Sequence, residues 1–370
     1  MRQSEGIIIL RLNTFISRSL LFICLFIGIL QTLQAEPYIA VRTGLKCSQC
    51  HVNITGGGKR TDFGTIYVQR FLSSQFLSDS SRKNFSTQLT ETISVGANFR
   101  VKNNIKYSYT HFDTAAVRNI VKNEYILDIT EGNFYFELNL IPNFFTFYFD
   151  QMISPNPDNR EAFGLFYGLP LRGYFKAGKF LLPYGFRLWD DEIFIREMTG
   201  FTYSDPDLGA EIGFEPGNYS FSVAVTSNQV SGIAAWVRRH GRLGFSWQKA
   251  TDGTDIRMFG IFSGLHTGRF TLLGEIDHIE LENGLQQEVY FAELNFLLLR
   301  GLNYKMTYNF FNRNLDVPIA RDGQERLTLG IEVFPFQFFQ LSAFYNINQF
   351  IPQNLALNQN TFTFELHFFF

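Results

Sequence analysis

The sequence predicts an all-β fold: a transmembrane antiparallel outer-membrane β-barrel of about 16–18 strands, preceded by a short N-terminal segment. Three observations lead to this fold class. The chain of 370 residues contains 43 Phe and 16 Tyr but only 18% charged residues, whereas a soluble domain has about 25%. Apolar residues alternate with polar ones along most of the chain. The connections between the alternating segments are short and long in turn, as in outer-membrane barrels.

Residues 1–35 are predicted to be a secretory signal peptide. Arg11 and Arg18 precede an apolar run over 20–30, and Ala35 supplies a small residue at the expected cleavage site. The alternative is a membrane anchor, for which this run is short. No later stretch has 18 or more uninterrupted apolar residues, which excludes membrane-spanning helices. Without residues 1–35 the net charge is about −4, which argues against nucleic acid as a partner.

The segment 36–86 contains the one motif that carries chemistry, Cys47-Ser48-Gln49-Cys50-His51. This is the attachment pattern for c-type haem. Two thiols separated by two residues can add to the two vinyl groups on one edge of a porphyrin, and the next residue presents its imidazole to the iron. We therefore expect one covalently bound haem c, with Cys47 and Cys50 forming the thioethers and His51 as the proximal axial ligand.

Other interpretations of the two cysteines are a disulfide, a thioredoxin-like dithiol or a zinc site. A dithiol of that kind is expected in a βαβ context, and zinc needs two further ligands close by, so the sequence favours neither. The disulfide is the main remaining alternative. The glycines at 56–58 are interpreted as a flexible tether.

The sixth ligand of the haem iron is not evident from the sequence. His367 is the first candidate, because alternation places it on the lumen side of the last strand and near the periplasmic rim. Met152 also has the lumen phase but lies at the outer end of its strand. Met306 has the lipid-facing phase.

The barrel is predicted to span residues 87–370. The lipid-facing phase of successive strands carries aromatic and aliphatic residues, for example at Phe134, Phe147 and Phe221, and the segments are about ten residues long. A soluble β-sandwich is the alternative, but it would rarely place so many aromatic residues on an alternating face. The chain ends in an alternating strand that finishes at Phe370, which resembles the assembly signal of bacterial outer-membrane proteins.

Short turns are expected at 142–143, 216–218, 267–268, 300–301 and 335, and longer loops at 152–161, 183–208, 281–285, 313–324 and 350–358. The loop 183–208 is rich in acidic residues. It could concentrate cations at the outer mouth, but we expect it to fold into the lumen as a constriction. An even number of strands places both ends of the barrel on the periplasmic side.

An exported chain with one haem motif after the signal peptide and a barrel over the rest resembles the fused monohaem cytochrome–porin family of bacterial outer-membrane proteins. The best-known members of that family are iron oxidases of iron-oxidising bacteria. The specific resemblance lies in Thr43-Gly44 before the motif and Phe63-Gly64 after it. It implies that Cys47 and Cys50 hold the haem and that His51 ligates its iron.

The leading functional hypothesis is a bacterial outer-membrane electron conduit, whose haem segment plugs the barrel from the periplasmic side. Its expected partners are outer-membrane lipid, the assembly machinery, and a periplasmic c-type cytochrome or another soluble electron carrier. The alternative is a porin for small solutes whose haem segment is a plug or sensor. A third hypothesis is redox catalysis at an open iron site, so the sequence leaves open whether the protein is an oxidoreductase acting on metal ions.

Overall fold

The computed structural model describes residues 37–74, 85–111, 118–190, 192–318, 323–351 and 358–370. The signal peptide predicted for residues 1–35 lies outside this part of the chain. Among the described residues, no helix has the length and apolar character that a membrane span requires.

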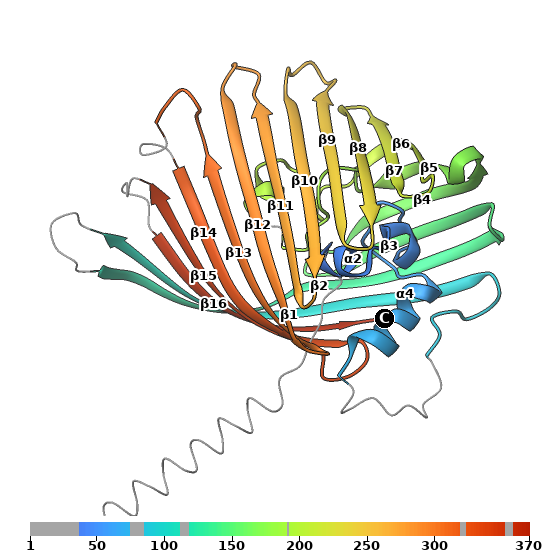
Figure 1. The fold of residues 1–370 in the computed structure, drawn as a ribbon, viewed down its shortest axis with the longest axis horizontal. Coiled ribbons are helices and arrows are strands. Elements are labelled where there is room, and N and C mark those ends of the chain that lie inside the picture. Colours follow the sequence, from blue (N-terminus) through green and yellow to red (C-terminus); the bar gives the residue numbers. More distant parts are fainter. Residues whose placement is uncertain (1–36, 75–84, 112–117, 191, 319–322, 352–357) are drawn as a thin grey trace, which may run out of the picture.

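The described residues form sixteen antiparallel strands, and β1 pairs with β16 to close the sheet into a barrel (Figure 1). This confirms the predicted fold class at the lower end of its range of strand numbers. The strands are β1 (Ile93–His111), β2 (Arg118–Ile141), β3 (Phe145–Ser154), β4 (Asp158–Leu169), β5 (Gly173–Phe180), β6 (Asp207–Phe214), β7 (Tyr219–Thr226), β8 (Gln229–Arg238), β9 (Gly241–Ala250), β10 (Arg257–Thr267), β11 (Phe270–Glu280), β12 (Gln286–Leu299), β13 (Leu302–Asn312), β14 (Gly323–Val333), β15 (Phe339–Ile351) and β16 (Asn358–Phe369).

Two long strands account for the lower strand number. β1 has 19 residues and β2 has 24, whereas about 9–11 residues are enough to cross a bilayer. β2 pairs with β1 along its length but with β3 only from Gly132 to Ile141. The outer parts of β1 and β2 therefore form a hairpin that extends beyond β3, drawn in teal at the left of Figure 1.

Apolar and polar side chains alternate between the two faces of the barrel, as predicted. On β16, Phe362, Phe364 and Phe368 are 41%, 43% and 41% exposed, whereas Glu365 and His367 are buried. The outward face is therefore the apolar one, which suits contact with lipid rather than with water.

The connections also follow the predicted order, with one error. Short turns such as 142–144 and 268–269 lie at one end of the barrel, and longer connections, including the described residues of 181–206 and residues 313–318, lie at the other. The predicted loop 152–161 is wrong, because only residues 155–157 separate β3 from β4. The polar residues that suggested a loop, such as Arg160 and Glu161, are instead buried side chains of β4.

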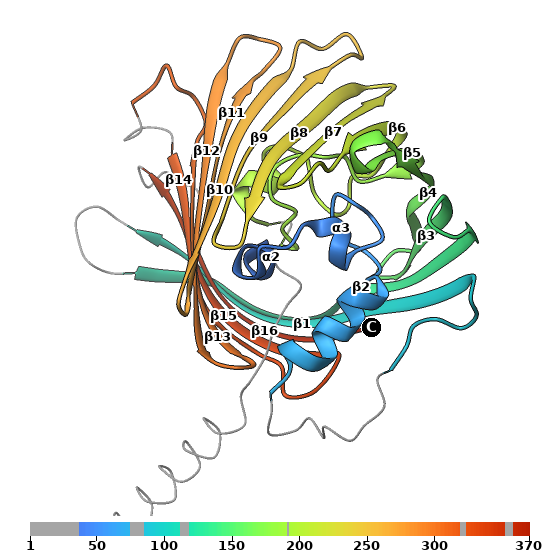
Figure 2. The ribbon, with the colours of Figure 1, turned by 45° about the vertical axis from the view of Figure 1, so that its right-hand side comes forward.

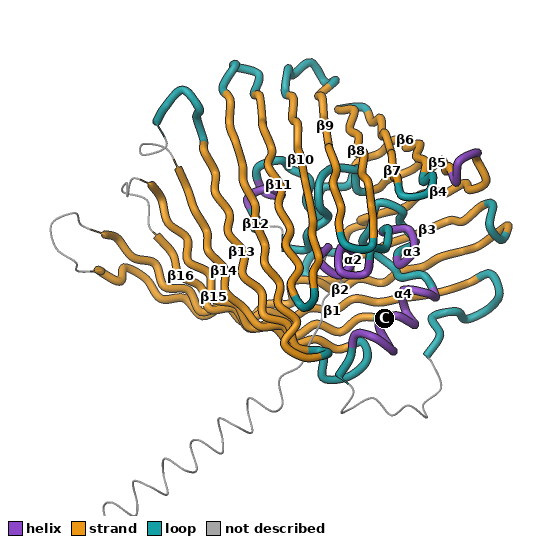
Figure 3. Tube along the Cα trace, in the orientation of Figure 1, coloured by secondary structure: helices purple, strands orange, loops and turns teal. Residues whose placement is uncertain are grey.

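Most of the N-terminal segment lies inside the barrel. Figure 2 shows its first two helices within the ring of strands, and Figure 3 shows that helices are confined to a few short pieces. These are α2 (Pro37–Thr43), α3 (Cys47–Cys50), α4 (Asp62–Tyr67), the π-helix η1 (Val68–Leu72), the 3-10 turn η2 (Pro170–Arg172) and α5 (Phe194–Glu197). We call residues 37–74 the plug.

The plug and the long connection 181–206 share an apolar core in the lumen. The connection folds inward, as expected for 183–208, and its helix α5 packs against β11, β12 and β13. One cluster of buried side chains combines the plug, the connection and the barrel wall, including Tyr38, Val41, Leu72, Phe186, Leu188, Ile195, Phe262, Leu273, Phe291 and Phe311. This core fills part of a lumen whose wall also carries buried polar side chains, for example Glu131, Glu293 and Asn295.

Candidate functional site in the barrel lumen

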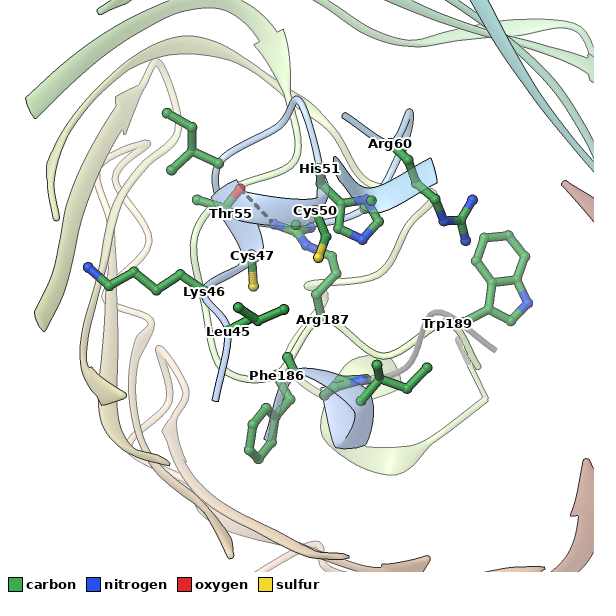
Figure 4. A pocket seen from close by; sticks show the side chains of 18 of the residues that line it. Leu45, Lys46, Cys47, Cys50, His51, Thr55, Arg60, Phe186, Arg187 and Trp189 are labelled. Carbon is green, nitrogen blue, oxygen red and sulfur yellow. Dashed lines mark hydrogen bonds between the residues drawn. The ribbon is translucent and has the colours of Figure 1, made fainter. Parts of the chain in front are cut away.

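The two cysteines of the motif lie on one turn of helix. The backbone N–H of His51 donates to the Cys47 carbonyl at 2.9 Å, and the Lys46 N–H donates to the side chain of Gln49 at 2.9 Å. Residues three apart in a helical turn share a face. Cys47 and Cys50 are both free and half-buried, and Figure 4 shows their sulfur atoms on the cavity side of α3 with His51 next to them.

A tight hairpin follows the motif and returns the chain to His51. The Val52 N–H donates to the Lys59 carbonyl at 3.0 Å, and His51 forms an antiparallel bridge with Arg60. The turn contains Gly56, Gly57 and Gly58 with φ values of 97°, 86° and 63°, which glycine adopts most readily. The glycines therefore form an ordered turn of the cavity wall, and their interpretation as a flexible tether is wrong.

Buried polar contacts hold this hairpin against the barrel wall. Asn53 donates to Glu161 of β4 at 2.6 Å and is fully buried. Lys59 forms an ion pair with Glu137 of β2 at 2.8 Å. Such contacts leave the motif little freedom to move relative to the strands, because breaking them would leave charged or polar groups buried without a partner.

The motif borders a large cavity inside the barrel. Its empty volume is about 1720 Å³, including space open to solvent, compared with about 300–1,000 Å³ for ordinary ligand pockets. Cys47, Cys50 and His51 line it from the plug, and Phe186 and Trp189 line it from the connection 181–206 (Figure 4). Strands of the barrel complete the lining, which combines aromatic side chains with several arginines.

Two arginines of the barrel wall are neutralised by carboxylates. Arg100 contacts Glu131 at 2.9 Å and Glu365 at 2.7 Å, and Arg160 contacts Glu131 at 3.1 Å and Asp150 at 2.7 Å. All five side chains are at least nine-tenths buried. This network holds the cavity wall in place, because separating its members would leave charges buried without a partner.

The protonation states of His51 and Cys50 suit a metal ligand and an uncharged thiol. Burial lowers the pKa of His51 to about 3, and the positive charge of Arg60 acts in the same direction. His51 is therefore a neutral imidazole at pH 7, the form that binds metals. Burial, with a smaller effect of Cys47, raises the pKa of the Cys50 thiol to about 11.

These residues fit a covalently bound haem. Two free thiols share one helical face, and the cavity beside them is large and rich in aromatic side chains. The Nδ1 atom of His51 is buried without a hydrogen-bond partner. The backbone of Gly57 and Gly58 acts on the same ring, as backbone acceptors do for metal-binding histidines, so the other ring nitrogen is the one left for a metal.

The other predicted ligand candidates differ in their surroundings. His367 lines the same cavity, but its Nδ1 contacts the Gln340 amide oxygen at 2.5 Å and its Nε2 contacts the Asn98 amide oxygen. A role as distal ligand would require one of these contacts to be released. Met306 is 39% exposed on the outer face, as expected from its phase, and Met152 lies near the outer end of β3.

Sequence reasoning did not identify Arg60, Arg187 or Trp189 as residues of the site. Arg60 follows His51 by nine residues, and only the glycine turn brings the two together. Arg187 and Trp189 belong to a connection that was expected in the lumen, but the sequence carries no signal that it meets the motif.

Comparisons with known proteins show the fold. No protein-family profile matches the sequence, and no curated relative matches it. An anion-selective porin from Comamonas acidovorans is similar in structure, with a TM-score of 0.55, 12% identity, and coverage of 75% of this chain and 100% of the porin. The outer membrane channel DcaP of Acinetobacter baumannii gives a TM-score of 0.55 at 8% identity, covering 77% and 100%. OmpT, an outer membrane protein of Vibrio cholerae, gives 0.56 at 8% identity, also covering 77% and 100%.

Proposed function

We propose that this chain is an outer-membrane protein that carries one covalently bound haem c in its lumen. Its role is to pass electrons between an extracellular donor or acceptor and periplasmic electron carriers. The observation that carries this proposal is that Cys47, Cys50 and His51 line one large cavity inside a closed barrel.

Each residue of the motif has a distinct role in this proposal. Cys47 and Cys50 hold the haem covalently, which prevents its loss to the medium. His51 supplies a neutral imidazole as the proximal ligand. When bound, the haem supplies one-electron redox chemistry at its iron. The protein would position the group beside the apolar core formed by the plug and the connection 181–206.

The height of the membrane limits how electrons can cross. The apolar belt of an outer-membrane barrel is about 25 Å tall, so one haem near the periplasmic plug cannot reach both surfaces alone. An extracellular reductant or oxidant must approach through the outer part of the lumen. A periplasmic c-type cytochrome or another soluble carrier would dock below the plug. The resemblance to cytochrome–porins makes ferrous iron a donor to test.

The first experiment tests covalent attachment. The full chain is expressed together with a c-type cytochrome maturation system, the membranes are fractionated, and the denatured protein is stained for haem in a gel. We expect a stained band in the outer membrane that disappears in Cys47→Ala/Cys50→Ala. A matched control is Ser231→Ala/Ser246→Ala, because both hydroxyls are buried in the barrel without a hydrogen-bond partner. An unstained wild-type band in the outer membrane would refute the proposal.

The second candidate function is passage of small solutes, with the plug as a closure or sensor. The comparisons favour it, because the structures described above are those of a porin, a channel and an outer membrane protein. The apolar core in the lumen favours a closed barrel instead. Conductance across a planar lipid bilayer separates the two. Steady, high conductance of the wild-type protein, together with unchanged redox activity in cells that lack it, would support the channel.

A further inference from the structure

Arg60 differs from the other arginines around the cavity because its side chain has no hydrogen-bond or ion-pair partner among the described residues. It is 8% exposed and lines the cavity next to His51. Figure 4 shows it projecting from the side of His51 opposite Cys47. Its guanidinium lies over the ring of Phe369, with the Cζ atom 4.2 Å from the ring centroid. Among the described residues it forms no ion pair and its side chain donates no hydrogen bond.

The charges nearest to Arg60 do not neutralise it. The carboxylates of Glu131, Glu365 and Asp150 are shared by Arg100, Arg160 and the nearby Lys102, which lies 3.6 Å from Glu365. None of these three carboxylates forms an ion pair with Arg60.

Other cavity arginines without a carboxylate have backbone partners instead. Arg187 donates to the carbonyl of Leu182 at 2.9 Å, and Arg242 donates to the carbonyl of Leu45 at 2.7 Å. Arg60 has neither kind of partner. The guanidinium of Arg60 borders the cavity, and contact with an aromatic ring offsets only a small part of the cost of placing an unbalanced cation there. Arg60 therefore indicates a site for an anion.

We propose that Arg60 binds a carboxylate of the haem held by Cys47, Cys50 and His51. This inference rests on the proposed function. A guanidinium matches a carboxylate with two parallel hydrogen bonds, and the haem brings carboxylates into the same cavity as its attachment thiols. A small free anion entering from solvent has the same chemistry, so the experiment distinguishes these two sources.

The test compares Arg60→Gln and Arg60→Lys with the wild-type protein in its haem-loaded form. The first readout is the midpoint potential, measured by spectroscopic redox titration at several pH values. Loss of the nearby positive charge stabilises the oxidised iron, and at protein-like dielectric we expect the equilibrium constant for reduction to fall roughly tenfold, which is about 59 mV for one electron.

The second readout is the pH dependence of that potential. With Arg60 present the carboxylate stays ionised, and the potential is nearly independent of pH between about 5 and 8. Without Arg60 the buried carboxylate gains a higher pKa, so reduction takes up a proton and the potential falls as the pH rises. Arg60→Lys should keep most of the wild-type behaviour, because it keeps the charge.

The control is Arg242→Gln, which removes another cavity arginine whose partner is a backbone carbonyl. It should leave the pH dependence unchanged; an equal change in this variant would show a general effect of cavity charge and overturn the proposal. Wild-type-like titrations of both Arg60 variants would overturn it as well.

If added phosphate or acetate shifts the wild-type potential at constant ionic strength, Arg60 binds a free anion instead of the haem carboxylate. Failure of wild-type haem staining would refute the proposed function and this inference together, whereas stained protein with an unaffected Arg60→Gln titration refutes the inference alone.

Discussion

Asn53 connects the plug to two charged side chains of the barrel wall. Its side chain donates to Glu161 and accepts from Lys176 at 3.2 Å, and all three residues are fully buried. We expect Asn53→Leu to lower the free energy of unfolding by about 1–3 kcal/mol, because it leaves buried polar groups with fewer partners. The measurement is guanidinium unfolding in detergent, followed by tryptophan fluorescence.

The matched control is Asn283→Leu, an exposed asparagine in the connection between β11 and β12. It should change the free energy of unfolding by less than about 0.5 kcal/mol. Equal effects of the two substitutions would contradict the role assigned to Asn53.

At the scale of residues, the sequence predicts the motif but not its surroundings. The spacing of Cys47, Cys50 and His51 is a local pattern, and one helical turn is enough to bring the side chains together. Arg60 and Trp189 enter the cavity through a glycine turn and an inward-folded connection. Their positions depend on packing between distant parts of the chain, for which a single sequence offers no periodic signal.

At the scale of elements, the strands expose an apolar outer face, and its contact with lipid can be tested directly. Ile276 lies on the outer face of β11 and is 50% exposed. Ile276→Arg should lower the free energy of unfolding in lipid vesicles by about 2–4 kcal/mol if this position lies near the middle of the bilayer. Ile276→Leu is the control and should fold like the wild type. An arginine variant as stable as the control would mean that this face does not contact lipid.

The inward-folded connection is a second element whose role can be measured. Ile195 of α5 is fully buried in the apolar core of the lumen. A carboxylate there would be buried without a partner, so Ile195→Asp should displace the connection and raise single-channel conductance in planar bilayers. Glu197→Gln changes an exposed residue of the same turn and should leave conductance at the wild-type value. Unchanged conductance of Ile195→Asp in folded protein would show that the connection does not close the lumen.

Strands were predictable because alternation repeats over many residues. The error at 152–161 has a physical reason that applies to barrels in general. The lumen side of a strand can carry as many charged residues as a loop, as Arg160 and Glu161 do. Polarity alone therefore cannot separate a strand end from a connection.

For the whole molecule, closure depends on the last strand. β16 pairs with both β15 and β1. Deletion of residues 358–370 would leave two strand edges unpaired in the membrane, where each backbone group without a partner costs several kcal/mol. We expect this variant to lack the folded form that migrates differently in unheated gel samples, whereas Phe364→Leu should retain it. A folded form of the truncated chain would show that closure does not require β16.

The contact between the two ends of the sheet also sets an order for biogenesis. The N–H of Phe370 donates to the carbonyl of Ala97 at 3.0 Å, so the seam joins the first strand to the final residue of the chain. The plug precedes the first strand and occupies the lumen that this seam encloses. If Cys47 and Cys50 are modified by an enzyme, we expect that enzyme to reach them most freely while the seam is open. Any covalent modification of these thiols is therefore expected before the last strand pairs with the first and closes the barrel.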